Sequence, residues 1–542
     1  MTDRSRDLTA IRHPMCGTRG MVATTEPLAT AAGIEVLAAS GNAADAAIAT
    51  AAALAVVEPN NTGLGGDCFA LYYDAQSGEV SALNGSGRAP SRLSIDRLVR
   101  EGMGEQLPLD HAHTVTVPGA CAGWFDLQKR HGTRPMDQLL APAIRLAEEG
   151  FAVAPFNSRL WDIGVRTQLG RSPGGRELMI DGRAPRAGEL FRNPAMARSL
   201  RSIATKGRDV FYAGEIGQKI VSTVQEFGGA LEMDDLEAHE STWEEPLSIE
   251  YRGLRVWECP PNGQGIASLM ALGLLSNLEL ADQDPLGPER FHLMIEVMRL
   301  AFADARWYVA DPALTPVPTA ELLSEAYAQE RLSKLDPARA SLDFEKGSPV
   351  AGSDTVYFCC VDAAGNACSF INSNYMAFGT GIVPEGTGFS LQNRGYGFSL
   401  DPAHPNALAP GKRPYHTIIP GLITREVDGS LWGPFGVMGG YMQPQGHMQV
   451  VVALADDGLD PQAALDRPRF NIVDGTAGGG VNLEPGVPEA TQRRLAEMGH
   501  PIQQSEGLGQ VLFGRGQVIR RESDGVLWGG TDPRADGCVM VV

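Results

Sequence analysis

The 542-residue sequence has no long hydrophobic run and comparatively little positive charge. Residues 1–10 carry charges without the apolar core of a secretory signal, and the apolar segment 46–57 is too short for a transmembrane helix. With 45 Lys and Arg against 65 Asp and Glu, the formal net charge of -20 disfavours nucleic acid and anionic membranes as partners. The sequence therefore predicts a cytoplasmic protein that binds neither membrane nor nucleic acid.

Cysteine pairs and metal-binding patterns are also lacking. The chain has eight Cys but no Cys-x-x-Cys pair, and Cys359, Cys360 and Cys368 fall inside apolar segments, which predicts reduced, buried thiols. His111 and His113 lie in a predicted loop without further ligands at suitable spacing, so we interpret them as surface histidines. The sequence predicts neither a metal nor a cofactor.

The residues that are present favour a globular protein with a buried β-hairpin. Hydrophobic residues make up 43% of the chain and charged residues 20%, and the length suggests about three domains. Within 353–374, two apolar, β-rich runs flank the turn sequence Asp-Ala-Ala-Gly-Asn, and both runs are apolar on both faces. If Val361 pairs with Cys368, Ser373 lies beside Val356 and within reach of Thr355.

Other segments predict helices, loops and one further strand. The Ala-rich stretch 31–57 predicts two helices separated at 40–42, where Gly41 serves as the helix stop. A loop at 58–67 leads into a strand at 68–73. Helices are expected at 139–149, 266–275 and 292–308, and the charged stretch 321–345 is expected to be an irregular connector.

Several spaced motifs resemble gamma-glutamyltranspeptidases. They are Thr355-Val-Tyr-Phe-Cys-Cys-Val-Asp, Phe378-Gly-Thr-Gly, Gly41-Asn-Ala-Ala-Asp-Ala-Ala and Met438-Gly-Gly. The resemblance covers nearly the whole chain. It implies an α+β fold, the four-layer αββα sandwich of N-terminal-nucleophile hydrolases. It also implies one interwoven domain in place of three, with residues 1–354 as a large-subunit segment and 355–542 as a small-subunit segment.

The resemblance makes Thr355 the nucleophile of a self-cleaving enzyme. A Thr hydroxyl needs a base, and a terminal α-amine, which titrates at about 7.7–8.0, can serve as one. Cleavage of the Asp354–Thr355 bond would create nucleophile and base together. The resemblance further assigns the oxyanion hole to the backbone amides of Gly439 and Gly440, and we expect Ser373 to support the nucleophile.

The anchors that this family uses for the glutamyl group are changed here. Ser86 stands where the family has the Arg that binds the α-carboxylate, Arg88 is out of register, and Gly397 stands where the family has the Asp that binds the α-amine. Arg394 adds a cation that can hold a carboxylate in two hydrogen bonds. The residues that we assign to substrate binding are Arg394, Asn393, Tyr375, His416, Thr417 and Ser86.

These features predict an amidase that cleaves a small-molecule amide, gamma-glutamyl or a related carboxylate-bearing acyl group, mainly by hydrolysis, with transfer as a second outcome. An oxamate-amidohydrolase-like enzyme, a glutaryl- or cephalosporin-acylase-like enzyme, and an unprocessed non-catalytic binding protein remain alternatives. A Ser86 nucleophile is disfavoured because the Gly-x-Ser-x-Gly elbow is absent. The two fragments are expected to stay associated. Whether the processed unit forms a homo-oligomer is left open by the sequence.

Overall fold

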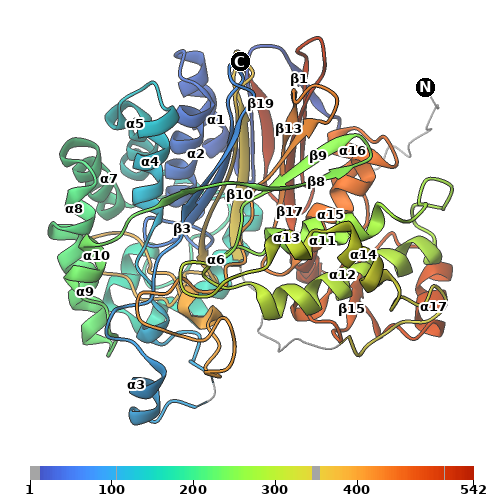
Figure 1. Cartoon of the computed structure of the whole chain (residues 1–542). Coiled ribbons are helices and arrows are strands. Elements are labelled where there is room, and N and C mark those ends of the chain that lie inside the picture. Colours follow the sequence, from blue (N-terminus) through green and yellow to red (C-terminus); the bar gives the residue numbers. More distant parts are fainter. Residues whose placement is uncertain (1–11, 105, 345–353, 506) are drawn as a thin grey trace.

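The computed structural model describes residues 12–104, 106–344, 354–505 and 507–542. Two sheets of seven strands each lie face to face in the middle of the molecule (Figure 1). The first sheet contains, in spatial order, β19 (Cys538–Val541), β2 (Met21–Thr24), β10 (Asp354–Val361), β11 (Ala367–Tyr375), β3 (Asp67–Tyr73), β4 (Val80–Gly85) and β7 (Thr242–Glu244).

The second sheet has the same number of strands. Its spatial order is β1 (Met15–Gly17), β18 (Leu527–Thr531), β17 (Arg515–Arg521), β13 (Leu431–Met438), β12 (Gly421–Arg425), β9 (Leu254–Glu258) and β8 (Leu247–Tyr251). All neighbouring strands of these two sheets for which a register is defined are antiparallel.

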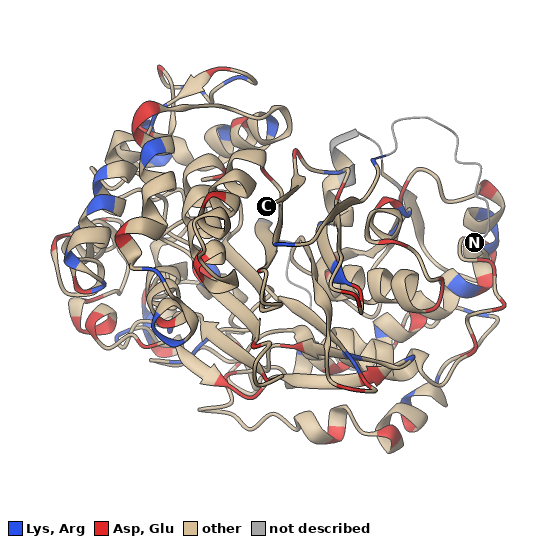
Figure 2. Cartoon of the chain, turned by 90° about the horizontal axis from the view of Figure 1, so that it is seen from above, with Lys and Arg blue, Asp and Glu red and all other residues tan. Residues whose placement is uncertain are grey.

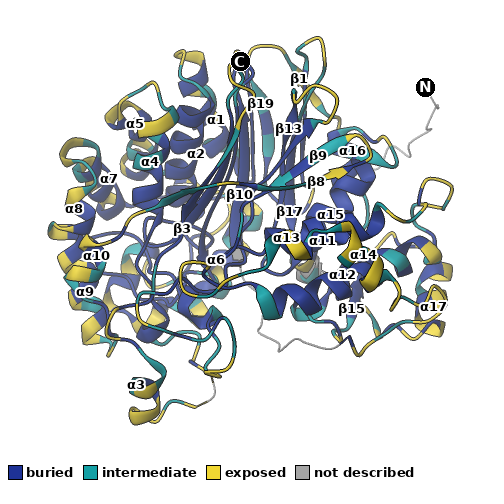
Figure 3. Ribbon diagram, in the orientation of Figure 1, coloured by how far each residue is buried: buried dark blue, intermediate teal, exposed yellow. Residues whose placement is uncertain are grey.

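Helices cover the outer face of each sheet, so the predicted four-layer αββα sandwich is confirmed. On the first sheet lie α1 (Pro27–Ala38), α2 (Ala43–Val57) and α4 (Ala120–His131). Farther out, α5 (Met136–Glu149) packs on α2, and α7 (Pro194–Lys206) packs on α5. On the second lie α11 (Gly265–Leu275), α15 (Met442–Ala455) and α16 (Pro461–Asp466), and α12 (Pro288–Tyr308) packs on α11. The helices next to the sheets, such as α2 and α11, are buried on all sides, and exposed residues lie mainly on the outer helices (Figure 3).

Smaller elements complete the periphery. They are α3 (Ile95–Arg100), α6 (Pro155–Thr167), α8 (Asp209–Tyr212), α9 (Glu215–Glu226), α10 (Met233–Glu237), α13 (Thr319–Leu322), α14 (Glu325–Leu332) and α17 (Glu489–Glu497), with β5 (Phe151–Ala152), β6 (Leu190–Phe191), β14 (Phe470–Ile472), β15 (Val481–Leu483) and β16 (Ile502–Gln504). The stretch 321–345 was thus wrongly predicted to be irregular throughout, because it contains α14. Residues 345–353, which precede the predicted cleavage point, lie outside the described residues.

The position of strand β10 inside the first sheet explains why its sequence is apolar on both faces. Val356, Phe358 and Cys360 pack in the core under the helices, whereas Tyr357 and Cys359 pack in the core between the sheets. Side chains alternate across a strand, and both faces of this one are covered. The interior strand predicted from the sequence is confirmed, since β10 lies between β2 and β11.

The predicted register of the hairpin is wrong by one residue. Val361 pairs with Ala367 rather than with Cys368, because Asp362 N–H donates to Asn366 O at 3.0 Å and closes a loop of residues 362–366. The ladder shifts again between Asp354 and Val356. As a result Thr355, not Val356, lies across from Ser373.

Glycines in the loop that follows α2 allow it to reach the end of this hairpin. A Cβ on Gly65 would lie 2.1 Å from the Ser390 carbonyl oxygen, and one on Gly66 would lie 2.3 Å from that of Ser373. Both distances are too short for any side chain. The loop is therefore fixed against β11, not the flexible turn that its composition suggests.

The break between α1 and α2 is confirmed, but its chemistry differs from the prediction. The residue with a left-handed conformation is Ser40, with φ of 64°, and not Gly41. A Cβ on Gly41 would come within 2.5 Å of Val36 Cγ1, so the glycine is needed for close packing. The helix expected at 139–149 belongs to α5, which Gly150 ends with a φ of 91°.

All eight cysteines are free thiols, and six are buried, although Cys16 is exposed. No helix among the described residues combines the length and the hydropathy needed to cross a bilayer. Charged side chains lie mainly on the outer helices and loops, and little charge lies along the two sheets (Figure 2).

Candidate active site

The strand ends bring two hydroxyl groups together between the sheets. Thr355 lies at the start of β10 and Ser373 near the end of β11, both completely buried, with Thr355 Oγ1 3.1 Å from Ser373 Oγ. Ser373 Oγ also accepts hydrogen bonds from Tyr375 N at 2.9 Å and from Arg394 Nη2 at 3.2 Å. These N–H donors use the oxygen's lone pairs, which leaves the Ser373 hydroxyl hydrogen to donate, and Thr355 Oγ1 is an acceptor within its reach.

The second sheet contributes two unpaired backbone amides close by. Tyr357 N lies 3.4 Å from Met438 Sδ, so the end of β13 faces the start of β10. Gly439 and Gly440 follow directly, with φ of 131° and 59°. Neither N–H donates to any other described residue, whereas the Gly440 carbonyl is held by Gln264 Nε2 at 2.9 Å. Such fixed, free donors are suited to stabilise a developing oxyanion.

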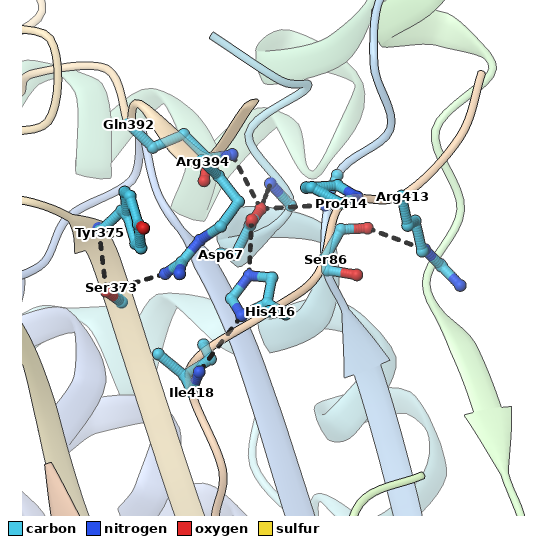
Figure 4. Close-up of polar contacts among 12 residues, drawn as sticks. Asp67, Ser86, Ser373, Tyr375, Gln392, Arg394, Arg413, Pro414, His416 and Ile418 are labelled. Carbon is cyan, nitrogen blue, oxygen red and sulfur yellow. Dashed lines mark hydrogen bonds and ion pairs between the residues drawn. The ribbon is translucent and has the colours of Figure 1, made fainter. Parts of the chain in front are cut away.

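Arg394 lies beside these groups in the short 3₁₀ helix η4 (Arg394–Gly397). Its guanidinium is fully buried, donates to Thr417 Oγ1 at 2.7 Å and to Ser373 Oγ, and lies over the Tyr375 ring at 4.2 Å from the ring centroid (Figure 4). A guanidinium has five N–H donors, and the Nε–H of Arg394 has no partner among the described residues. Burial lowers the pKa of Arg394 to about 10, and Asp67 opposes that shift.

The residue that sequence reasoning missed is Asp67, at the start of β3. Its Oδ1 accepts hydrogen bonds from Gly87 N, Gly119 N and Gln392 Nε2 at 3.0, 3.2 and 2.9 Å, and its Oδ2 accepts one from His416 Nε2 at 3.0 Å (Figure 4). Four segments far apart in sequence therefore meet on one carboxylate. No sequence pattern relates them, because only the fold brings them together.

Asp67 also balances the charge of Arg394. The carboxylate is completely buried, and desolvation raises its pKa to about 6 while the Arg394 cation and the hydrogen bonds oppose that rise. His416 stays neutral, since burial and the nearby cations Arg394 and Arg413 hold its pKa well below the usual range. The Arg394 guanidinium and the Asp67 carboxylate thus act on each other within this buried centre, and no direct ion pair joins them among the described residues.

The other predicted binding residues have partners within the protein. His416 bonds Asp67 and packs edge-on against Phe69 at a centroid distance of 4.9 Å, and Asn393 joins Met376 N to Leu109 O. Thr417 holds Arg394. Tyr375 adopts a φ of 79°, and its ring supports the same guanidinium. The structure therefore brings Tyr375, Thr417 and His416 into the surroundings of Arg394.

Neither position 86 nor position 88 replaces the arginine of the family at this centre. Ser86 is buried and bonds Asn84 Oδ1 at 2.7 Å, while its carbonyl accepts from Arg413 Nε at 3.1 Å. Arg88 points to the Glu240 carbonyl instead. His113 is buried, so the surface position predicted for it is wrong. It bonds Glu101 at 2.6 Å, and His111 accepts from His113 N, so neither histidine belongs to the site.

Comparison with known proteins shows how far these features are shared. The family described as Gamma-glutamyltranspeptidase matches residues 29–542. The chain belongs to this family. It is therefore an amidohydrolase of the N-terminal-nucleophile type, as its motifs predict.

Relatives within the gamma-glutamyltranspeptidase family align over the whole length. A glutathione hydrolase-like proenzyme of Bacillus subtilis is 35% identical over 529 residues, which is 97% of this chain and 98% of the relative. An oxamate amidohydrolase proenzyme of Klebsiella pneumoniae is 34% identical over 534 residues, 96% of this chain and 98% of that one. The crystal structure of a cephalosporin acylase from Bacillus halodurans superimposes with a TM-score of 0.92 at 44% identity, covering 100% of this chain and 99% of that chain.

Proposed function

We propose that this family member cleaves its own Asp354–Thr355 bond and then hydrolyses an amide through an acyl-Thr355 intermediate. The observation that carries the proposal is the contact between Thr355 Oγ1 and Ser373 Oγ, near the Gly439 and Gly440 N–H groups, which have no acceptor in the part of the chain that the structure describes. After cleavage, the α-amine of Thr355 takes the hydroxyl proton as Oγ1 attacks the amide carbonyl. The Gly439 and Gly440 amides hold the oxyanion, and the leaving amine takes the proton.

Water then attacks the acyl-Thr ester and releases the acid. The same base accepts a proton from that water, so nucleophile and base are regenerated together. An amine in place of water would give transfer, which we keep as a secondary outcome. Amide hydrolysis by this route requires only groups that the chain itself supplies.

The substrate is proposed to be an amide whose acyl group carries a carboxylate. Arg394 supports this, since its Nε–H has no partner among the described residues and its cation lacks a direct ion pair. The nucleophile Thr355 lies only two hydrogen bonds away, through Ser373. A carboxylate held at Arg394 must therefore be close to the scissile carbonyl, as it is in oxamate-like, glutaryl and gamma-glutamyl amides.

Location and wider role are proposals as well. The charge balance and the free thiols support a cytoplasmic enzyme. A place in glutathione metabolism would follow if gamma-glutamyl amides are substrates.

The proposal is tested by sequencing and by one substitution. Purified protein should give two bands, and the smaller fragment should start Thr-Val-Tyr-Phe. Thr355→Ala should remain one chain and lack activity on every amide, while Thr355→Ser should retain cleavage. A wild-type chain that stays intact and is nevertheless active would refute the proposal.

A further inference from the structure

A cavity of about 820 Å³ opens beside the active site. It lies between α3 and the chain segment 397–406, and Arg306 of α12 and Tyr415 complete its wall. A volume of this size is within the range of small-molecule sites and far exceeds a glutaryl group. None of the steps proposed for Thr355 uses this space.

Two short segments connect the cavity to the catalytic centre. Arg394 and Gly397 are the first and last residues of η4, and residues three apart in a 3₁₀ helix lie on the same side. Gly397 lines the cavity, and Tyr415, two residues before the Arg394 partner Thr417, lines it too. Gly397 itself packs on the Tyr415 backbone, since a Cβ there would lie 2.9 Å from the Tyr415 carbonyl oxygen. The cavity approaches the catalytic centre through its lining residue Arg306, which packs on Tyr441, the residue after Gly440.

The lining combines apolar side chains, one cation and the polar side chains of Gln106, Ser399, Asp401, His404 and Asn406. Its apolar side chains are Ile95, Leu98, Val99, Met103, Phe398 and Leu400. Among the described lining residues Arg306 is the one Lys or Arg, and the one carboxylate, Asp401, is exposed. The Arg306 guanidinium lies 4.4 Å from the Tyr441 ring centroid and 5.6 Å from that of Tyr415, so two aromatic faces fix its position. An acceptor oxygen suits the inner end of the cavity and a hydrocarbon chain suits the rest.

We propose that the cavity binds an acyl substituent on the carbon next to the substrate's carboxylate, so that the substrates are γ-amides of N-acylated glutamic acid. This rests on the proposed function, because it takes Arg394 as the carboxylate anchor. The N-acyl carbonyl oxygen accepts from Arg306, and the alkyl chain lies against Val99 and its apolar neighbours. Burial of the chain supplies affinity in proportion to its length.

Binding of the product acids to the self-processed enzyme tests the site by calorimetry. N-hexanoyl-L-glutamate should bind at least about tenfold more tightly than glutarate or L-glutamate. Val99→Trp fills the cavity mouth and should remove this gain while leaving glutarate binding within twofold. Val427→Trp is the matched control, since Val427 is 88% exposed in the β12–β13 loop, and it should keep the gain.

Arg306→Met should weaken the binding of N-acetyl-L-glutamate about tenfold relative to the binding of glutarate. Glutarate binding also shows whether the variant is folded. Equal binding of N-hexanoyl-L-glutamate and glutarate, or a Val99→Trp enzyme that binds like wild type, would overturn the proposal. Hydrolysis of the γ-anilides of the same acids is measured separately. Tight binding without Thr355-dependent hydrolysis rejects the amidase and keeps the cavity site, whereas hydrolysis of glutaryl anilide without the chain-length gain rejects the cavity site alone.

Discussion

At the scale of single residues, Ser373 matters because its oxygen joins the nucleophile to Arg394. Ser373→Ala removes one hydrogen bond to Thr355 Oγ1, on the order of 1–2 kcal/mol, so kcat should fall roughly five- to thirtyfold. Steady-state kinetics with thermal denaturation as a folding control checks this. Unchanged turnover would show that the 3.1 Å contact has no role in the reaction.

Arg394 is predicted to act on substrate affinity. Arg394→Ala should raise KM for carboxylate-bearing amides by roughly tenfold or more, if the contact contributes about 1.5 kcal/mol. Amides without a carboxylate serve as the control and should be much less affected. Wild-type KM values for these amides in the variant would contradict the proposed anchor.

Asp67 gives the site a pH dependence that can be separated from that of the terminal amine. Its pKa of about 6 means that the carboxylate, which accepts four hydrogen bonds and balances Arg394, is lost as the pH falls through 6. The Thr355 amine loses its basicity below about 8. We expect log(kcat/KM) to fall with slope one below the amine pKa and with slope two below about pH 6.

Asp67→Asn should be less active at every pH and should show slope one throughout. A slope of two that persists in the variant would assign the second proton to another group. The KM of the Asp67→Asn variant for glutaryl amides, measured in the same experiment, shows whether Arg394 has kept its position, because a displaced Arg394 would raise this KM.

Sequence reasoning singled out the candidate site residues that stand in a motif and missed Asp67, which is recognisable only by its contacts. Thr355, Ser373, Gly439 and Gly440 are recognisable because they stand in spaced, family-like sequences. Asp67 ends an ordinary glycine loop, and its four donors come from distant segments. Its importance follows from burial and hydrogen bonding, which a single sequence does not show.

At the scale of elements, local chemistry predicted the strands better than their pairing. The apolar runs and the Asp-x-x-Gly-Asn turn correctly predicted the β10–β11 hairpin. Its loop, however, closes between Asp362 and Asn366, which shifts the register by one residue from the predicted pairing. A one-residue shift reverses which face every side chain occupies. The contact between Thr355 and Ser373 depends on this shift.

The first turn of α1 predicts how stability depends on pH. Glu26 caps this helix through Leu28 N and Ala29 N, and burial, with Glu58 and then Asp536 adding repulsion, raises its pKa from 4.5 to about 8. The folded state therefore holds this proton more tightly than the unfolded state. The resulting stabilisation is complete below about pH 4.5 and is lost as the pH rises through 8.

Denaturant unfolding should accordingly show roughly 2–3 kcal/mol less stability from this group at pH 9 than at pH 6. Glu26→Gln keeps a capping oxygen and removes the titration, so its stability should change less over that interval. If wild type and variant lose stability in parallel between pH 6 and 9, Glu26 does not bind the proton.

At the scale of the whole molecule, the two segments on either side of Thr355 share both sheets. In the first sheet β10 lies between β2 and β11, and β11 pairs with β3; in the second, β12 joins β9 to β13. The length alone suggests about three domains, but the cores continue across both segments. Composition cannot show this, because the mixing arises from strand order.

Cleavage before Thr355 should therefore leave the two fragments as one folding unit. The new ends form at the start of β10, while the strand keeps its ladders with β2 and β11 and its apolar contacts on both faces. We expect the fragments to co-elute in gel filtration even in 1 M salt, because apolar burial and sheet hydrogen bonds resist screening.

The two fragments should separate only in denaturant, in a single transition detected alike by far-UV circular dichroism and by Trp fluorescence. Thr355→Ala, which keeps the chain intact, is the control and should unfold at a concentration-independent midpoint, whereas the midpoint of the cleaved protein should rise with its concentration. Release of a folded small fragment under native conditions would contradict this interdependence.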